Sequence, residues 1–288
     1  MNGELVATTT ADRVRLNGFF IAARGGDAHQ ADGAVIVHGL AGNFYSSPLL
    51  LNIGNRLAGI GIHSVLANTR GHDVLNWTIR SGRSQTIGSS VEDVSECTHD
   101  LNAWSEYLIR QGCRRVFLIG HSLGAIKSLF AAAHGAHASL AGVVALSPTR
   151  LNYEQFVQSS QCDVFLATMA QAAELVAQGN PQQLMQIQFP FPTWMAAQAY
   201  LEKYGPENRF DWLAFADRIA VPMLATFGEL ELRDNPAFEG LRDELSKKQL
   251  NNNNVELQVV PGADHFYVAC IELVCNSIVE WLDRQAKK

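Results

Sequence analysis

The sequence predicts an α/β fold built on a mostly parallel, doubly wound sheet, meaning a sheet covered by helices on both faces. Two observations lead to this fold class. Short apolar runs alternate with amphipathic helical patterns along most of the 288 residues, which is typical of parallel strands joined by helices. In addition, 47% of the residues are hydrophobic and only 17% are charged, so the chain can bury a large core.

The expected elements follow in order along the chain. An opening antiparallel hairpin and six further strands are expected at residues 5–10, 14–22, 34–37, 62–67, 115–119, 143–146, 223–227 and 255–260. After the third strand, Ser47 caps a helix that has Pro48 at its first position. Apolar stripes predict further helices from Val91 to Leu108, directly after the fifth strand, and from Val268 to Leu282. Residues 70–90, rich in Gly, Ser and Arg, are expected to form a loop.

One segment breaks the alternation of strands and helices. Residues 150–208 have a helical pattern without a convincing strand, and four prolines divide it into short helices. We expect this segment to be a helical cap, or lid, inserted into a core domain formed by residues 1–149 and 209–288. Most of its aromatic side chains would attach the cap to the sheet, and a few would line a substrate pocket.

The motif Gly120-His121-Ser122-Leu123-Gly124 lies between an expected buried strand and an expected helix, and this context predicts a nucleophile elbow. Side chains at positions 120 and 124 would collide in so sharp a turn, so glycine is required at both. The turn exposes the Ser122 hydroxyl. It also places the Leu123 N–H in the first turn of a helix, where free donors favour a developing oxyanion.

A serine hydroxyl becomes a strong nucleophile only when a base lies within hydrogen-bond reach and a carboxylate orients that base. Among nine histidines, His265 is the preferred base because it lies in the loop between the last strand and the last helix. His38 precedes Gly39 in a loop better suited to supplying backbone donors. His121 is expected to point away from the nucleophile along the strand alternation.

The acid is expected between Ser122 and His265, at the end of the penultimate strand. Three carboxylates follow Gly228 there. Glu231 is preferred because, in enzymes with such a triad, the acid commonly lies three residues after the glycine that ends this strand, and because its neighbours Leu230 and Leu232 suggest an inward-facing loop. Glu229 and Asp234 remain alternatives. A glutamate in place of the usual aspartate would require the backbone to lie farther back from the histidine.

Composition excludes several other function classes. The net charge of -6 and the pI of about 5.8 argue against nucleic acid as a partner. The five cysteines are an odd number without a Cys-x-x-Cys pair, which argues against a disulfide framework and a structural zinc site. With no secretion signal and no apolar stretch of membrane-spanning length, we expect a cytoplasmic protein. The oligomeric state stays open, with a homodimer as one alternative.

Together these features resemble the α/β-hydrolase superfamily over nearly the whole chain. The resemblance rests on the order Ser122, Glu231, His265, on the His38-Gly39 pair after an early strand, on residues 68–73, and on a cap inserted after Leu146. Residues 37–43 and the Arg-Gly-His-Asp loop are similar to those of intracellular carboxylesterases of the cinnamoyl or feruloyl type. A looser likeness is to siderophore-ester hydrolases.

The resemblance implies a serine esterase that cleaves a carboxylic ester through an acyl-enzyme intermediate, without a metal or an organic cofactor. The oxyanion would rest on the backbone N–H groups of Leu40 and Leu123. The apolar cap favours a small-molecule ester with an apolar or aryl group. An acyltransferase or a cofactor-free lyase with the same triad is an alternative, as is a non-catalytic binding protein with this fold.

Three charged residues near these motifs have less specific interpretations. Lys127, one turn into the elbow helix, either pairs with an acid near the pocket or is a solvated or core-edge lysine with a buried stem, and the second interpretation is preferred. Arg70 and Asp73 are expected to tie loops together rather than to bind substrate.

Overall fold

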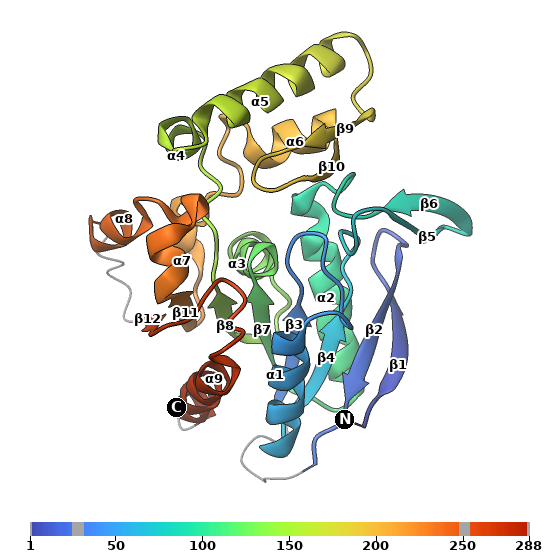
Figure 1. The fold of residues 1–288 in the computed structure, drawn as a ribbon. Helices are drawn as coiled ribbons and strands as arrows, with labels where there is room; N and C mark the ends of the chain where they lie inside the picture. Colours follow the sequence, from blue (N-terminus) through green and yellow to red (C-terminus); the bar gives the residue numbers. More distant parts are fainter. Residues whose placement is uncertain (1, 25–31, 248–253, 287–288) are drawn as a thin grey trace.

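The computed structural model describes residues 2–24, 32–247 and 254–286, and an eight-stranded sheet forms its centre (Figure 1). Its strands are β1 (Glu4–Thr9), β2 (Arg15–Ile21), β3 (Asp32–Val37), β4 (His63–Ala67), β7 (Arg115–His121), β8 (Leu140–Leu146), β11 (Met223–Gly228) and β12 (Val255–Val260). They lie in the order β1-β2-β4-β3-β7-β8-β11-β12. The pairs β1/β2 and β2/β4 are antiparallel, and all others are parallel, which confirms the predicted fold class.

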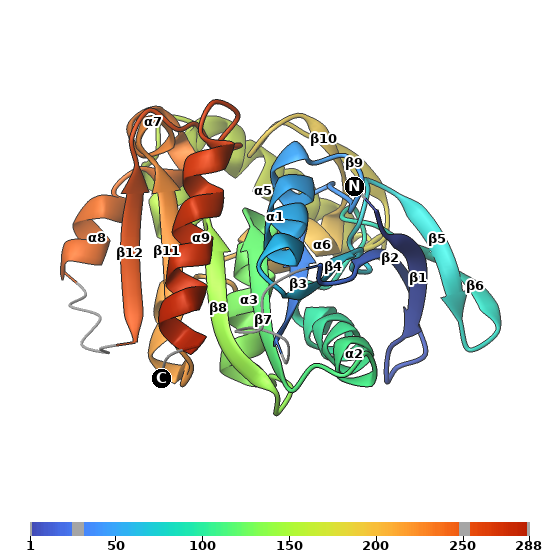
Figure 2. The same cartoon turned by 90° about the horizontal axis from the view of Figure 1, so that it is seen from below.

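Helices cover both faces of this sheet (Figure 2). Helices α1 (Pro48–Gly59) and α9 (Ile271–Ala286) pack on one face, and α2 (Cys97–Arg110) and α3 (Leu123–His134) on the other. Strand β3 shows the two-sided burial most clearly, because Ala34 and Ile36 belong to the core under α1 and α9 while Val35 and Val37 belong to the core under α2 and α3. The expected cap of α1 is confirmed: the Ser47 side chain accepts a hydrogen bond from the Leu50 N–H at 3.4 Å.

The region expected to be a loop contains a hairpin that the sequence analysis missed. Strands β5 (Asn76–Arg80) and β6 (Arg83–Ile87) pair antiparallel, and Ser81 and Gly82 connect them with φ of 49° and 78°. These strands are mostly polar, so the alternation of apolar and polar residues that predicts a strand could not be recognised in the sequence. Helix α2 also begins later than expected, at Cys97, and α9 begins after Val268, at Ile271.

The chain between β8 and β11 lies over the carboxyl end of the sheet (Figure 1). It contains α4 (Tyr153–Gln158), α5 (Cys162–Ala177), β9 (Leu184–Ile187), β10 (Thr193–Ala196) and α6 (Ala197–Tyr204). The expectation that residues 150–208 lack strands is wrong, because β9 and β10 form an antiparallel hairpin. Each strand has only four residues, too few for a period of two to stand out beside the helical patterns.

The remaining elements are short. They are helices α7 (Glu229–Asp234) and α8 (Leu241–Lys247) and the 3-10 turns Val94–Glu96, Trp212–Ala214, Ala216–Arg218 and Pro236–Phe238. Within the described ranges, every helix is too short or too polar to cross a membrane.

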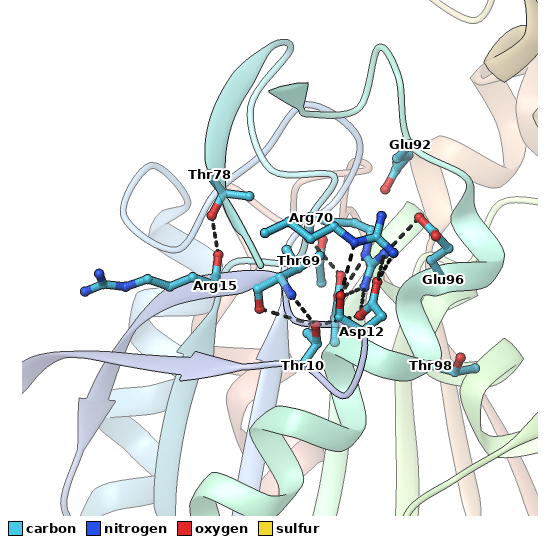
Figure 3. Close-up of polar contacts among 12 residues, drawn as sticks. Thr10, Asp12, Arg15, Thr69, Arg70, Thr78, Glu92, Glu96 and Thr98 are labelled. Atoms are coloured by element: carbon cyan, nitrogen blue, oxygen red, sulfur yellow. Dashed lines mark hydrogen bonds and ion pairs between the residues drawn. The ribbon is translucent and has the colours of Figure 1, made fainter. Parts of the chain in front are cut away.

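Arg70 ties three segments together beside the sheet, as expected (Figure 3). Its guanidinium donates to Asp12 in the β1–β2 turn at 3.0 Å and to Asp100 of α2 at 2.8 Å, and it pairs with Glu96 at 2.8 Å. Although burial alone would lower it, the pKa of Arg70 is raised by these carboxylates. Asp73 fixes neighbouring loops, as also expected, by accepting hydrogen bonds from the side-chain amides of Asn43 and Asn76 at 2.7 and 2.9 Å.

Candidate active site

Ser122 lies at the sharp turn between β7 and α3. Its backbone has φ 55° and ψ -121°, and its N–H donates to the Leu146 carbonyl at 2.8 Å. A Cβ atom on Gly120 would lie 2.1 Å from the Gly124 carbonyl oxygen, and one on Gly124 would lie 2.4 Å from the His38 carbonyl oxygen. The predicted need for glycine at both positions is therefore confirmed, and the motif forms the expected strand-turn-helix.

A cavity of about 630 Å³ opens beside this turn, between the end of the sheet and the chain above it. Ser122, His121 and His265 contribute to its wall from the sheet side. Phe156, Pro190, Phe191 and Tyr204 contribute from the segment between β8 and β11. Among the described residues that line it, none is Asp, Glu, Lys or Arg, so the cavity has an apolar, uncharged wall.

His265 and Glu231 come together as the sequence predicts. The His265 Nδ1 lies 2.7 Å from Glu231 Oε2, with the two side chains 18% and 0% exposed. Because an ionised carboxylate only accepts hydrogen bonds, Nδ1 carries the proton and, in the neutral imidazole, Nε2 keeps its lone pair. The Ser122 hydroxyl shares the cavity with His265, although within the described part of the chain it makes no hydrogen bond to the imidazole.

The other two candidate acids lie elsewhere. Glu229 is exposed and accepts a hydrogen bond from the Gly262 N–H at 2.9 Å. Asp234 is exposed and pairs with Arg233 at 2.6 Å. Across residues 2–24, 32–247 and 254–286, His265 has a hydrogen bond to a carboxylate only at Glu231.

Glu231 lies in the short helix α7 rather than in a loop, and this position explains how its longer side chain meets His265. It occupies the third position of the helix, where its Oε1 reaches back to accept the Gly228 N–H at 2.6 Å. Folding the longer side chain back in this way brings its second oxygen to His265.

Three polar residues behind Glu231 were not predicted. Ser147 donates to Glu231 Oε1 at 2.6 Å, and because its one proton is used there, Tyr267 donates to Ser147 at 2.8 Å. Thr226 lies 2.9 Å from the Tyr267 hydroxyl. Burial raises the pKa of Tyr267 above its usual value, so the phenol stays neutral. The sequence contained one signal for Ser147. It directly follows the strand at residues 143–146, and this strand pairs with the strand that precedes Glu231.

The expectation that His121 points away from the site is wrong. Its Nε2 donates to the His265 backbone carbonyl at 2.7 Å, and the two rings lie 4.9 Å apart. The strand alternation directs His121 to the face over which the His265 loop folds, and the rings of Phe266 and Tyr267 surround it there. Burial, reinforced by His265, lowers the pKa of His121 to about 3, so its imidazole is neutral.

The turn after β3 approaches Ser122 closely. A Cβ atom on Gly39 would lie 3.2 Å from the Ser122 Cβ, and Leu40 lines the cavity next to it. In the part of the chain that the structure describes, neither the Leu40 N–H nor the Leu123 N–H donates to a protein acceptor. Two backbone donors are thus available beside the Ser122 hydroxyl.

Lys127 pairs with an acid, contrary to the preferred expectation of a solvated or core-edge lysine. It is fully buried, and its ammonium donates to Glu92 Oε2 at 2.7 Å. Glu92 lies in the loop before α2 and also binds Lys203 of α6. Among the described residues, no group of three or more His, Cys, Asp or Glu side chains is arranged to hold a metal ion.

Comparisons with known proteins identify the fold. A model of the "Alpha/beta hydrolase family" matches residues 34–271, and a search of curated protein sequences finds no match. Est1E from Butyrivibrio proteoclasticus, solved with bound ferulic acid, has a TM-score of 0.68 at 17% identity over 98% of this chain and 99% of its own. The hydrolase GrgF from Penicillium sp. sh18 has a TM-score of 0.70 at 16% identity over 100% of both chains. The Pyrococcus furiosus esterase Pf2001 has a TM-score of 0.62 at 19% identity over 98% of this chain and 91% of its own.

Proposed function

The chain belongs to the alpha/beta hydrolase family, and on this premise we propose that it is a serine esterase that cleaves a carboxylic ester. Ser122 is the nucleophile, His265 the general base, and Glu231 the carboxylate that orients the base. The observation that carries this proposal is the 2.7 Å bond from His265 Nδ1 to Glu231 in a cavity whose wall includes Ser122 on its strained turn.

The reaction has two acyl-transfer steps. As Ser122 Oγ forms a bond to the ester carbonyl carbon, its proton moves to His265 Nε2, and the carbon–oxygen bond to the leaving alcohol then breaks as Nε2 returns that proton to the alcohol. Water next attacks the acyl-enzyme and gives a proton to Nε2. The acyl–Oγ bond breaks, and Ser122 recovers the proton. In both steps Glu231 stabilises the imidazolium that forms.

The N–H groups of Leu40 and Leu123 receive the negative charge on the carbonyl oxygen. Both are backbone donors beside Ser122, and the Leu123 N–H lies at the amino end of α3, where the helix dipole adds to its effect. By analogy with other oxyanion donors, each contributes about 3 kcal/mol to stabilising the transition state.

The substrate is a neutral ester with an apolar or aryl body. An uncharged cavity wall supports this choice, because an ionised group placed there would lose its hydration without gaining a partner. The volume of about 630 Å³ is within the usual range for small-molecule sites. The ferulic acid bound to Est1E is itself an aryl acid. Residues 150–208 act as the cap that closes this cavity over a core of residues 1–149 and 209–288.

Labelling with a fluorophosphonate probe and hydrolysis of a panel of aryl and alkyl esters test the proposal together. Ser122→Ala should abolish labelling and lower kcat/KM by about 10⁴-fold or more. The matched control is Ser105→Ala, which removes a buried hydroxyl that donates to Leu101 within α2. It should leave labelling and turnover nearly unchanged. Retained activity in Ser122→Ala, or labelling of another residue, would contradict the proposed nucleophile.

A further inference from the structure

Three buried charged side chains link the chain above the cavity to the elbow helix. Lys203 of α6 lies 3.4 Å from Glu92 Oε1, and Lys127 of α3 lies 2.7 Å from Glu92 Oε2. All three side chains are only 1% exposed. Buried charges are expensive unless they are paired, so this cluster can exist only while both helices keep their positions around Glu92.

The carboxylate at the centre of this cluster has little freedom to move. A Cβ atom on Gly71 would lie 1.7 Å from Glu92 Oε2, so the carboxylate packs directly against the backbone. Burial alone would raise the pKa of Glu92, but the ammonium groups of Lys127 and Lys203 lower it to about 2. Glu92 therefore stays ionised and holds both lysines.

From Lys127 a directed series of hydrogen bonds leads toward the nucleophile. The Lys127 ammonium donates to Thr69 Oγ1 at 3.1 Å, and Thr69 Oγ1 lies 3.2 Å from His38 Nε2. The Thr69 N–H donates to the same nitrogen at 3.2 Å. Thr69 is itself fixed, because the next residue, Arg70, binds Asp12 (Figure 3) and also Asp100.

The tautomer of His38 follows from its partners. Nδ1 lies 2.8 Å from the Gly39 carbonyl oxygen, which can only accept, so Nδ1 carries the proton and Nε2 accepts from Thr69. Burial and the nearby Lys127 ammonium lower the pKa of His38 to about 3, which keeps the ring neutral. The Gly39 carbonyl also accepts the Gly42 N–H at 3.1 Å.

This carbonyl belongs to the same peptide group as the Leu40 N–H. Two donors on the carbonyl fix the plane of the Gly39–Leu40 peptide, and by polarising it they make its N–H a stronger donor on the opposite side. A donor held in place before the reaction stabilises a developing oxyanion more than one that must reorient.

We propose that Lys203, Glu92 and Lys127 are positioning residues that act through Thr69 and His38 on the Gly39–Leu40 peptide. The position of α6 over the cavity thereby sets the orientation and the donor strength of the Leu40 N–H. The inference rests on the proposed function, because it assigns that donor role to the Leu40 N–H.

Thr69→Val tests the middle of the series with little change in volume, and Thr8→Val is its matched control. Thr8 is also a buried threonine; its hydroxyl donates to the Ala103 carbonyl, and both residues lie outside the set that lines the cavity. Thr69→Val should lower kcat about tenfold and slow phosphonylation of Ser122 by a similar factor, with KM changed less than about twofold. Thr8→Val should leave all three unchanged. Equal kcat values for Thr69→Val and wild type would overturn the inference.

Lys203→Met tests the link to α6, and it leaves the Lys127–Glu92 pair electrically neutral so that the core can still form. We expect it to lower kcat about threefold on its own. Combined with Thr69→Val it should cause no further loss, because the series is already interrupted at Thr69. Additive losses would show that Lys203 acts only through general stability, and would contradict the proposed coupling.

Nitrogen-15 NMR of histidine-labelled protein separates this inference from the proposed function, since it needs no turnover. His38 should be protonated at Nδ1 at neutral pH, and protonation at Nε2 would overturn the series. If Ser122 resists the fluorophosphonate probe while His38 shows the expected tautomer, the proposed function fails and the hydrogen bonds assigned to His38 stand. If Ser122 is labelled and His38 has the other tautomer, the proposed function stands and the hydrogen-bond series fails.

Discussion

Two glutamates are buried close to the cavity, and their surroundings differ in kind. Glu231 receives hydrogen bonds from the Gly228 N–H, the Ser147 hydroxyl and His265, at 2.6, 2.6 and 2.7 Å. Glu92 lies instead between the ammonium groups of Lys127 and Lys203. One carboxylate accepts from a backbone amide, a hydroxyl and an imidazole, and the other lies between two ammonium groups, although burial lowers the pKa of Lys203.

Under the proposed function, this difference separates a group that takes part in the reaction from one that mainly holds the framework. A positive charge appears beside Glu231 only when His265 accepts a proton. The negative charge of Glu231 then stabilises the imidazolium that forms. The field of Glu92 is already neutralised, and moving it would leave two ammonium groups without a partner. Substitutions at Glu231 should therefore change mainly the rate, whereas substitutions at Glu92 should change mainly stability and, through the Leu40 N–H, the rate to a smaller extent.

The largest expected effect is on turnover, in Glu231→Gln. The glutamine oxygen can still accept the Gly228 N–H, but its NH₂ group would then face His265 Nδ1 and favour the wrong tautomer. We expect kcat to fall by about 10³- to 10⁴-fold while the free energy of unfolding changes by about 1 kcal/mol or less. Steady-state kinetics and urea unfolding measure the two quantities.

Glu229→Gln is the matched control, since this exposed neighbour also lies in α7. It should change kcat less than about twofold. A comparable loss in Glu229→Gln, or a mainly structural defect in Glu231→Gln, would remove the contrast between the two buried carboxylates.

The next effect is on stability, in Glu92→Gln. Removing one partner from a buried ionic cluster costs about 3 to 5 kcal/mol, because the remaining charges stay buried without compensation. Chemical unfolding at pH 7 measures this loss. Glu106→Gln is the control: Glu106 lies in an exposed pair with Arg110, at 3.9 Å, and its loss should cost less than about 1 kcal/mol.

The dependence of stability on pH gives an independent check on Glu92. Its pKa in the folded protein is about 2, below the ordinary value of 4.5, so the unfolded chain binds more protons between these values and stability falls as pH falls through this window. The free energy of unfolding of wild type should therefore change with a slope about 1.4 kcal/mol per pH unit steeper than that of Glu92→Gln. Equal slopes would mean that Glu92 does not carry this charge.

The comparison also shows which parts of the site a sequence can predict. Ser122, His265 and Glu231 each follow the end of a strand, and local spacing was enough to propose all three; the structure brings His265 within 2.7 Å of Glu231 and places it on the same cavity as Ser122. The groups around them come from remote positions: Ser147 is 84 residues from Glu231 in the sequence, and Lys203 is 111 residues from Glu92. No local pattern records such pairings. The orientation of His121 was wrong for the same reason, because it depends on a loop 144 residues away.

The smallest expected effect is that of Ser147→Ala, which sharpens the account of Glu231. Without this hydroxyl, Glu231 Oε1 loses one of two neutral donors, and the Tyr267 hydroxyl loses its acceptor. Because a freer carboxylate orients His265 less well, kcat should fall about tenfold, and unfolding should become easier by about 1 to 2 kcal/mol. Ser64→Ala is the matched control, since Ser64 is equally buried but its hydroxyl has no hydrogen-bond partner within the described residues. Ser64→Ala should change the free energy of unfolding by less than about 0.5 kcal/mol and leave kcat nearly unchanged. If Ser147→Ala loses stability but keeps the wild-type kcat, Ser147 belongs with Glu92 among the groups that hold the framework, and Glu231 needs only the Gly228 N–H to stay aligned.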